Sequence, residues 1–125
     1  MTVKERDELI KKIFDKCRVI LLKKGHDYSG EEDCLSNLRD FGFLGVVVRL
    51  GDKYNRLKNF VKQRTLQVKD ESVVDTLLDT INYAFLAIIF YCIENGVEIP
   101  ALTEKEKQLL QDNLKYKEEK TVIDY

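Results

Sequence analysis

Hydrophobic residues recur along most of this chain at i, i+3, i+4 and i+7, the spacing of an amphipathic α-helix. The first such segment covers residues 3–24, where charged residues occupy the other side. We expect this helix to end at Gly25, since glycine is common just past helix ends. The apolar positions of this segment are Leu9, Ile10, Ile13, Phe14, Cys17, Ile20 and Leu21.

The polar segment HDYSGEEDCLSN, which starts at His26, predicts a loop. A short helix is expected near residues 34–40, with a break at Gly42. Residues 44–63 then give the second long helix, because their apolar residues cluster on one side at 3.6 residues per turn. These apolar residues are Val46, Val47, Leu50, Tyr54, Leu57 and Val61.

Two more helices follow. Asp70 is a suitable N-cap for a third long helix over about 71–94, and Asn95 with Gly96 provides its stop signal. Thr103 and Glu106 match a capping box, S/T-x-x-E, that opens a last helix over about 104–117. Residues 118–125 are expected to be a loose tail or an arm onto a partner subunit. The fold class is therefore predicted as all-α, a bundle of about four main helices.

Composition is consistent with this architecture. A chain of 125 residues fits one domain, residues 1–125, and 44% hydrophobic with 34% charged residues is ordinary for a soluble globular protein. One proline and six glycines indicate few breaks and long helices. The net charge of −1 argues against broad binding to nucleic acids or anionic membranes, although it leaves a local basic pocket open.

The cysteines and the N-terminus favour a cytoplasmic protein. Cys17, Cys34 and Cys92 lack the spacing of a metal site, and their odd number indicates free thiols in a reducing compartment. The N-terminus, MTVKERDELIKK, lacks the apolar core of a signal peptide. The longest apolar run, around 84–93, is shorter than the roughly 20 residues that span a bilayer.

The third predicted helix carries acidic residues at every fourth position: Glu71, Asp75 and Asp79. Like charges at this spacing destabilise a helix by roughly 0.2–0.5 kcal/mol per pair. On a helical wheel they share an arc of roughly 80° with Asn82, beside the apolar face. A divalent cation would offset the repulsion of such a stripe.

The second predicted helix has a similar polar stripe of Gly45, Arg49, Asp52, Arg56 and Asn59. If the two helices pack through their apolar faces, both stripes line one cleft. Clustered carboxylates suit Mg²⁺ (or Mn²⁺), and arginines bind phosphate with two parallel hydrogen bonds. The plainer alternative, a solvated face or a network of salt bridges between the helices, stays open.

Other chemistries have less support. The dipeptide His26–Asp27 resembles the metal-binding pair of HD-type phosphohydrolases, but such sites need further histidines and this chain has one. The sequence has neither a P-loop nor a GxGxxG motif. A single histidine also leaves no convincing zinc cluster, and nothing in the spacing supports a Cys–His nucleophile.

Three segments carry a family resemblance: KKGHDYSGEEDCLSNLRDFG, GVVVRLGDKYNRLKNFVK and VKDESVVDTLLDTINYAFLAI. They resemble a phage and bacterial group of the MazG-like all-α nucleoside triphosphate pyrophosphatases, often described as a nucleotide-modification-associated domain. The resemblance covers about Lys23 to Ile89. It rests on Lys24, Asp27, Tyr28 and Asn37, on Arg49, Asp52, Lys53, Arg56 and Leu57, and on Glu71, Ser72, Asp75, Thr76 and Asp79.

This resemblance implies an antiparallel helical bundle that forms a homodimer or homotetramer in the cytoplasm. It also implies Mg²⁺ held by acids on two helices and cleavage of a nucleoside triphosphate to the monophosphate and pyrophosphate. Better-studied members carry E-x-x-E and E-x-x-D on the two helices. Here Arg49 and Asp52 stand in place of the first pair, and the second helix has E-x-x-x-D-x-x-x-D.

The resemblance and the stripes together assign roles. We expect Mg²⁺ ligands at Asp52, Glu71, Asp75 and Asp79, with Glu71 or Asp79 as the catalytic base. Phosphate-binding residues would be Lys24, Arg49, Lys53 and Arg56, although the wheel puts Lys53 off the stripe, where solvent exposure is the alternative. Base and sugar contacts would come from Tyr28, Asn37, Asn82 and Tyr83; for the tyrosines the alternative is core packing, and for Asn37 a helix cap.

Two further classes stay open. The altered acid pattern also fits a catalytically weak nucleotide-binding or accessory protein. If the stripes are salt bridges, the chain is a structural or partner-binding helical protein, and Asp75→Asn lowers its stability. A metal site predicts that Asp75→Asn leaves the stability of the metal-free protein unchanged or raised.

Overall fold

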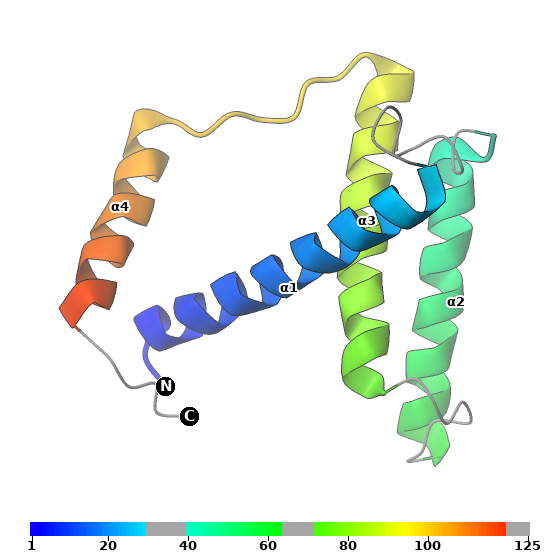
Figure 1. Cartoon of the computed structure of the whole chain (residues 1–125), viewed down its shortest axis with the longest axis horizontal. Coiled ribbons are helices and arrows are strands. Elements are labelled where there is room, and N and C mark those ends of the chain that lie inside the picture. Colours follow the sequence, from blue (N-terminus) through cyan, green and yellow to red (C-terminus); the bar gives the residue numbers. More distant parts are fainter. Residues whose placement is uncertain (30–39, 64–71, 120–125) are drawn as a thin grey trace. The chain divides into compact units, whose positions relative to one another are not determined.

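The computed structural model describes residues 1–29, 40–63 and 72–119. These residues form four helices, α1 (Val3–Ser29), α2 (Gly42–Gln63), α3 (Val73–Asn95) and α4 (Glu104–Glu119) (Figure 1). No strand occurs among them. The predicted all-α fold class is confirmed.

The chain divides into two compact units. One contains residues 1–16 and 100–125, and the other contains residues 17–99. The division falls within α1, so its first half belongs with α4 and its second half with α2 and α3. The expectation of a single domain stays a prediction.

The unit of residues 17–99 is built around the antiparallel pair α2 and α3 (Figure 1). Its core joins Val46 of α2 to Ala87 and Phe90 of α3. At one end of the pair, Phe43 meets Tyr91 edge-on, with ring centroids 5.4 Å apart. Partly buried side chains that pack against this core are Phe43, Leu50, Tyr83 and Leu86.

The predicted apolar face of α2 is only partly correct. Val46 is buried and Leu50 partly buried, but Val47, Tyr54 and Val61 are 41%, 62% and 65% exposed. The contact line is rotated by about one residue, since α3 lies against Phe43, Val46 and Leu50. The apolar residues of α2 cover an arc wider than one line of contact, so the sequence does not show which of them meet the neighbouring helix.

At the ends of α3, the predicted N-cap is wrong and the predicted stop is confirmed. The predicted N-cap, Asp70, is wrong: Ser72 caps the helix, and its Oγ accepts a hydrogen bond from the Asp75 amide at 3.0 Å. The predicted stop is confirmed, because Gly96 adopts the left-handed conformation (φ 63°) and its amide bonds back to the Cys92 carbonyl. Glycine takes this conformation without the steric cost of a side chain.

The end of α1 also differs from expectation. Gly25 does not stop the helix, which continues to Ser29 and includes the first four residues of the predicted loop. A glycine inside a helix costs about 1 kcal/mol relative to alanine, which the surrounding turns can tolerate. The helix predicted at 34–40 lies outside the described residues except for Asp40, which is in a turn.

In the unit of residues 1–16 and 100–125, both helices start with a capping box. The predicted box of α4 is confirmed: the Thr103 amide donates to Glu106 at 2.9 Å, and the Glu106 amide donates to Thr103 at 3.2 Å. Thr2 and Glu5 form the same reciprocal pair before α1, at 2.8 and 3.1 Å. The T-x-x-E spacing of Thr2 and Glu5 is the sequence signal that predicts this second box.

Candidate functional site

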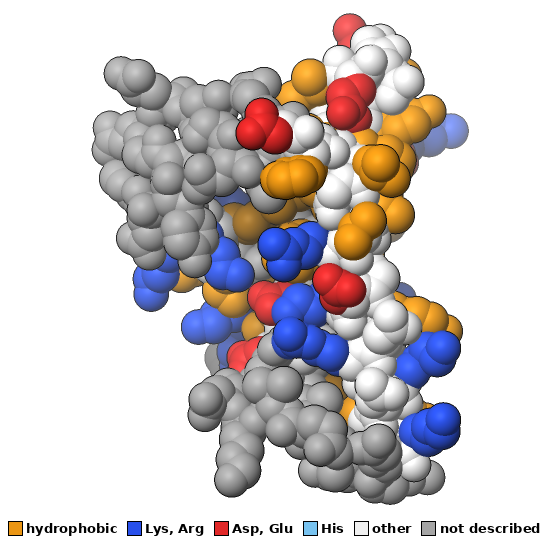
Figure 2. Space-filling model, turned by 90° about the vertical axis from the view of Figure 1, so that its right-hand side faces the viewer, with side chains coloured by type: hydrophobic (Ala, Val, Ile, Leu, Met, Phe, Trp, Pro, Cys, Tyr) orange, Lys and Arg blue, Asp and Glu red, His pale blue; other side chains and the backbone are white. Residues whose placement is uncertain are grey.

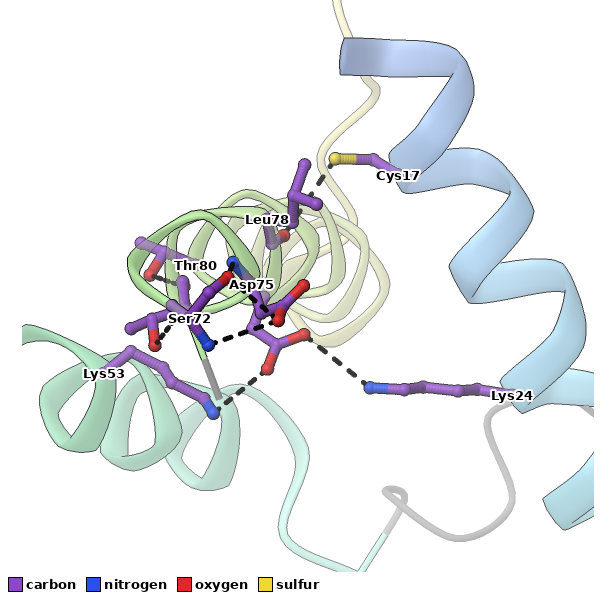
Figure 3. Close-up of polar contacts among 9 residues, drawn as sticks. Cys17, Lys24, Lys53, Ser72, Asp75, Leu78 and Thr80 are labelled. Carbon is purple, nitrogen blue, oxygen red and sulfur yellow. Dashed lines mark hydrogen bonds and ion pairs between the residues drawn. The ribbon is translucent and has the colours of Figure 1, made fainter. Parts of the chain in front are cut away.

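The carboxylate of Asp79 lies between two lysines from different helices (Figure 3). Lys53 of α2 approaches it to 3.1 Å, and Lys24 of α1 to 3.8 Å. The side chains of Asp79 and Lys53 are 24% and 12% exposed, whereas Lys24 is 49% exposed. Screening by water is therefore weaker between Asp79 and Lys53 than at Lys24.

The position of Lys53 was misjudged from the sequence. The wheel put Lys53 outside the polar stripe, with solvent exposure as the alternative. It instead lies one turn after Leu50, on the side of α2 that faces α3, and its ammonium group reaches Asp79. The long apolar stem of lysine allows a position on the contact line while the charge sits at the rim.

Asp75, the second acid of the stripe, holds the start of α3 together. Its Oδ2 accepts hydrogen bonds from the Ser72 amide at 3.2 Å and the Ser72 hydroxyl at 2.9 Å. This is the reciprocal half of the capping box, which satisfies backbone donors at the start of the helix. Asp75→Asn should therefore lower stability whether or not Asp75 binds a cation, so that substitution does not separate the two interpretations.

Asn82 is buried one turn after Asp79, with 5% of its surface exposed. Neither its amide nitrogen nor its oxygen has a hydrogen-bond partner in the part of the chain that the structure describes. Thr76, which is fully buried on the same helix, contrasts with it, because its hydroxyl donates to the Ser72 carbonyl at 3.2 Å. Buried polar groups are normally paired, so Asn82 is the exception that needs explaining.

Cys17 brings the second half of α1 against α3. Its Sγ lies 4.0 Å from the Leu78 carbonyl oxygen, and the residue is fully buried (Figure 3). Burial raises the pKa of the Cys17 thiol, and the negative charge of Asp79 raises it further. The thiol therefore stays protonated at neutral pH and is a poor nucleophile.

The remaining stripe residues of α2 lie on the same side of the α2–α3 pair as Asp75 and Asp79. On each of the two helices, the polar stripe is rotated about the helix axis away from the line along which α2 and α3 touch, and in the same sense. Because the two helices are antiparallel, both stripes then lie on one face of the pair. On this face Arg49 and Asp52 are exposed, and Arg56 is partly buried. Figure 2, seen from the side of α2, shows basic and acidic side chains gathered in the middle of the surface.

The candidate nucleoside contacts separate into three groups. Asn82 is described above, and the ring of Tyr83 packs against the core between α2 and α3, as the alternative interpretation had it. Tyr28 lies in the last turn of α1, but its side chain is outside the described part. Asn37 and Glu71 also lie outside it.

The four proposed Mg²⁺ ligands are tested only in part by this geometry. Among residues 1–29, 40–63 and 72–119, no three His, Cys, Asp or Glu side chains gather as a metal site would require. Glu71 does not belong to that set, so the complete group of Asp52, Glu71, Asp75 and Asp79 stays a prediction. Chemically, carboxylate oxygens are the donors that a hard divalent cation prefers.

Helix α3 has a second property that the apolar run around 84–93 did not reveal. By length and composition alone it is long and apolar enough to cross a membrane, as no other helix of the described residues is. Only 22% of that stretch is buried. A helix at the centre of a soluble protein would bury more of itself, so the exposed apolar surface of α3 needs an explanation.

Comparisons with models of known protein families, with curated proteins and with solved structures found no match. The resemblance to the MazG-like pyrophosphatases therefore rests on the motifs of this sequence.

Proposed function

We propose that this protein is a Mg²⁺-dependent nucleoside triphosphate pyrophosphohydrolase, which converts a nucleoside or deoxynucleoside triphosphate to the monophosphate and pyrophosphate. The observation that carries the proposal is the Lys24–Asp79–Lys53 cluster with buried Asn82 one helical turn away. It combines charged groups suited to phosphate with an unpaired amide suited to a base or sugar. The resemblance to MazG-like enzymes, whose motifs include Lys24, Lys53 and Asp79, is the second support.

Phosphate binding begins with the two lysines. Each forms an ion pair with Asp79 in the free protein, so an incoming triphosphate competes with that carboxylate for their ammonium groups. Lys24, the more exposed of the two, is the easier to redirect. Arg49 and Arg56 on the same face add guanidinium donors that bind phosphate oxygens in pairs.

Nucleoside recognition is assigned to Asn82. An amide has two donors and two acceptors, enough to bond the edge of a base or the hydroxyl groups of a sugar. Leaving these groups unpaired in the interior costs about 1–3 kcal/mol, which a bound nucleoside would recover. Tyr28 and Asn37 complete the proposed contacts, whereas packing in the core makes Tyr83 a support for this region.

The carboxylates are assigned to the hydrolytic step. Asp52, Glu71, Asp75 and Asp79 would hold Mg²⁺, which supplies charge neutralisation at the phosphates and acidifies a bound water. Glu71 or Asp79 orients the attacking water and accepts its proton. Asp79 can act as the catalytic base only after Lys24 and Lys53 have turned to the phosphates. Binding of the substrate therefore frees the carboxylate that accepts the proton.

One observation favours the alternative, a nucleotide-binding accessory protein with weak or no hydrolysis. In the free protein Asp75 is engaged in the helix cap, and Asp79 is held by two lysines. If both acids keep these partners when a nucleotide binds, the site recognises the triphosphate without cleaving it. The homodimer or homotetramer implied by the resemblance fits either function.

The test is a substrate panel. Purified protein is incubated with each canonical rNTP and dNTP in Mg²⁺, then in Mn²⁺, and the products are separated by chromatography. Asp79→Asn is the test variant, and Glu98→Gln, an exposed acid in the connector after α3, is the control. Monophosphate and pyrophosphate from the wild type and Glu98→Gln, but not from Asp79→Asn, support the pyrophosphohydrolase.

The panel also separates the alternatives. The absence of turnover with every substrate contradicts the pyrophosphohydrolase. In that case a thermal shift with one nucleotide, lost in Asn82→Ala, supports the accessory protein. A protein that responds to no nucleotide is a structural or partner-binding helical protein.

A further inference from the structure

Each oxygen of the Asp79 carboxylate faces a positive charge in the structure. The Lys53 ammonium group lies 3.1 Å from Oδ2, and the Lys24 ammonium group lies 3.8 Å from Oδ1 (Figure 3). The two lysines come from α2 and α1, and Asp79 comes from α3, so three helices bring these charges together. We call Lys24 and Lys53 the lysine pair. Both oxygens that Asp79 could offer to a metal ion are therefore already approached by a cationic side chain.

A divalent cation and the lysine pair compete for these oxygens. Mg²⁺ binds its oxygen ligands at about 2.0–2.1 Å. Bound at Oδ2 of Asp79, it would lie no more than about 5 Å from the Lys53 ammonium group, which is itself 3.1 Å from that oxygen. At equal distance, the repulsion between a divalent and a monovalent cation is twice that between two monovalent cations. Binding of the metal at Asp79 is therefore opposed while the lysine pair stays in place.

Lys53 contributes most to this opposition, because it is the less exposed of the two lysines. Its side chain is 12% exposed and lies on the side of α2 that faces α3, one turn after Leu50. Little water reaches its ammonium group, so separating it from Asp79 without offering another anion is costly. Lys24 is 49% exposed and can turn into solvent more easily. Metal binding at Asp79 thus requires an anion that draws Lys53 away.

The neighbouring acid of α3 offers no easier position for the metal. Oδ2 of Asp75 accepts hydrogen bonds from the amide and the hydroxyl group of Ser72, at 3.2 and 2.9 Å. A cation at this oxygen would displace the hydrogen bonds that cap the start of α3. In the structure, Asp75 and Asp79 are thus both engaged with groups of the protein itself.

We propose that the lysine pair takes the place of the divalent cation in the protein without nucleotide, and that the cation binds at Asp79 only together with a triphosphate. The inference rests on the proposed function, which supplies the triphosphate. A triphosphate carries several negative charges, so it can attract both ammonium groups away from Asp79. The released carboxylate and the phosphate oxygens then make a suitable set of ligands, since Mg²⁺ is usually bound by one or two carboxylates plus substrate phosphates.

This exchange of partners couples the binding of the two ligands. Triphosphate raises the affinity of the protein for the metal, and by linkage the metal raises the affinity for triphosphate by the same factor. A pair of salt bridges with a purely structural role makes a different prediction. In that case the removal of Lys53 changes the stability of the protein and leaves its affinity for the metal as it was.

The first experiment measures binding of Mn²⁺ alone to the full chain, without nucleotide, from the electron paramagnetic resonance signal of free Mn²⁺. Lys53→Met keeps a stem of similar length and removes the charge, so it should bind Mn²⁺ at least about tenfold more tightly than the wild type. Lys62→Met, the same change at an exposed position of α2, is the matched control and should bind like the wild type. Adding Asp79→Asn to Lys53→Met should abolish the gain, which locates the metal at Asp79.

Lys24→Met guards against a variant that simply misfolds. The side chain of Lys24 is half exposed, so this variant should keep the helix content of the wild type in circular dichroism. It should also bind Mn²⁺ more tightly than the wild type, by about threefold. The gain is smaller than in Lys53→Met, because the Lys24 charge is farther from Asp79 and better screened by water.

Inorganic tripolyphosphate tests the coupling without a base or a sugar. In the wild type it should raise the amount of protein-bound Mn²⁺, measured by water proton relaxation against the same mixture of Mn²⁺ and tripolyphosphate without protein. In Lys53→Met the increase should be smaller, because the carboxylate is already accessible to the metal.

A wild type that binds Mn²⁺ alone as tightly as Lys53→Met overturns the proposal, and so does the lack of a gain in both lysine variants. The measurements with Mn²⁺ alone contain no nucleotide, so they are independent of the substrate panel. A protein that hydrolyses triphosphates but binds Mn²⁺ tightly on its own contradicts the role of the lysine pair and not the pyrophosphohydrolase. A protein that hydrolyses none, yet gains the metal site in Lys53→Met, contradicts the pyrophosphohydrolase and supports the competition at Asp79.

Discussion

Helices α3 and α4 begin in the same way and then differ. Ser72 with Asp75 and Thr103 with Glu106 exchange the same two hydrogen bonds, at 3.0 and 3.2 Å and at 3.2 and 2.9 Å. Along its length α3 buries five residues, whereas every position of α4 up to Asp112 is exposed. A capping box therefore decides where a helix begins, while burial decides which of its polar groups acquire unusual partners.

The largest difference between the two helices should appear at their acids. Asp79→Asn removes a charge that pairs with Lys53 and Lys24, and should lower the free energy of unfolding by about 2 kcal/mol. This value lies between the contributions of exposed and of buried ion pairs. Asp112→Asn, at an exposed site of α4, should change it by less than about 0.5 kcal/mol. Urea unfolding measures both, and equal effects would remove the distinction between the helices.

A second test uses the buried amide of α3. Asn82→Leu replaces an unpaired polar group by an apolar one of similar size, and should raise the free energy of unfolding by about 1–2 kcal/mol. The thermal response to nucleotides should disappear in the same variant. A large loss of stability would instead mean that Asn82 has a structural partner.

The two caps allow a matched comparison of smaller size. Ser72→Ala should lower the global free energy of unfolding by about 1 kcal/mol, because α3 is part of the core. Thr103→Ala should mainly speed amide hydrogen exchange in the first turn of α4, since an exposed helix frays locally. A similar global loss in both variants would show that α4 unfolds together with α3.

The smallest effect concerns the pKa of Glu106. The Thr103 amide, and then the Thr103 hydroxyl, holds this pKa below its usual value of 4.5. A carboxyl whose pKa is lowered by folding stabilises the helix above the unfolded value, and this contribution is lost as the pH falls through the folded pKa. NMR titration should place the Glu106 pKa below 4.5 in the wild type and nearer to it in Thr103→Ala; an unchanged value would contradict the cap.

Local signals made much of the fold predictable from the sequence. Gly96 and the Thr103–Glu106 pair depend on residues a few positions apart, and the structure confirms both. Errors arose where neighbouring residues compete for one role. Ser72 caps α3 in place of Asp70, since its partner Asp75 stands three positions later, and Gly25 is simply part of α1.

The candidate site was less accessible to sequence analysis, because it depends on how helices face each other. The acidic stripe of Asp75 and Asp79 can be read from the sequence. The hydrogen bonds by which Asp75 caps the start of α3 were not predicted from it. The position of Lys53 follows from a contact line that the apolar residues of α2 defined only to within one residue. The unpaired state of Asn82 can be seen only with the neighbouring helices in place.

The buried thiol of Cys17 can report how often α1 and α3 separate locally. Sγ is enclosed against the Leu78 carbonyl, and its raised pKa disfavours the thiolate, so a thiol reagent can act only while α1 lifts from α3. Cys92 is partly exposed and sets the time scale for an accessible thiol in the same molecule. The ratio of the two labelling rates reports how often the packing around Asp79 opens.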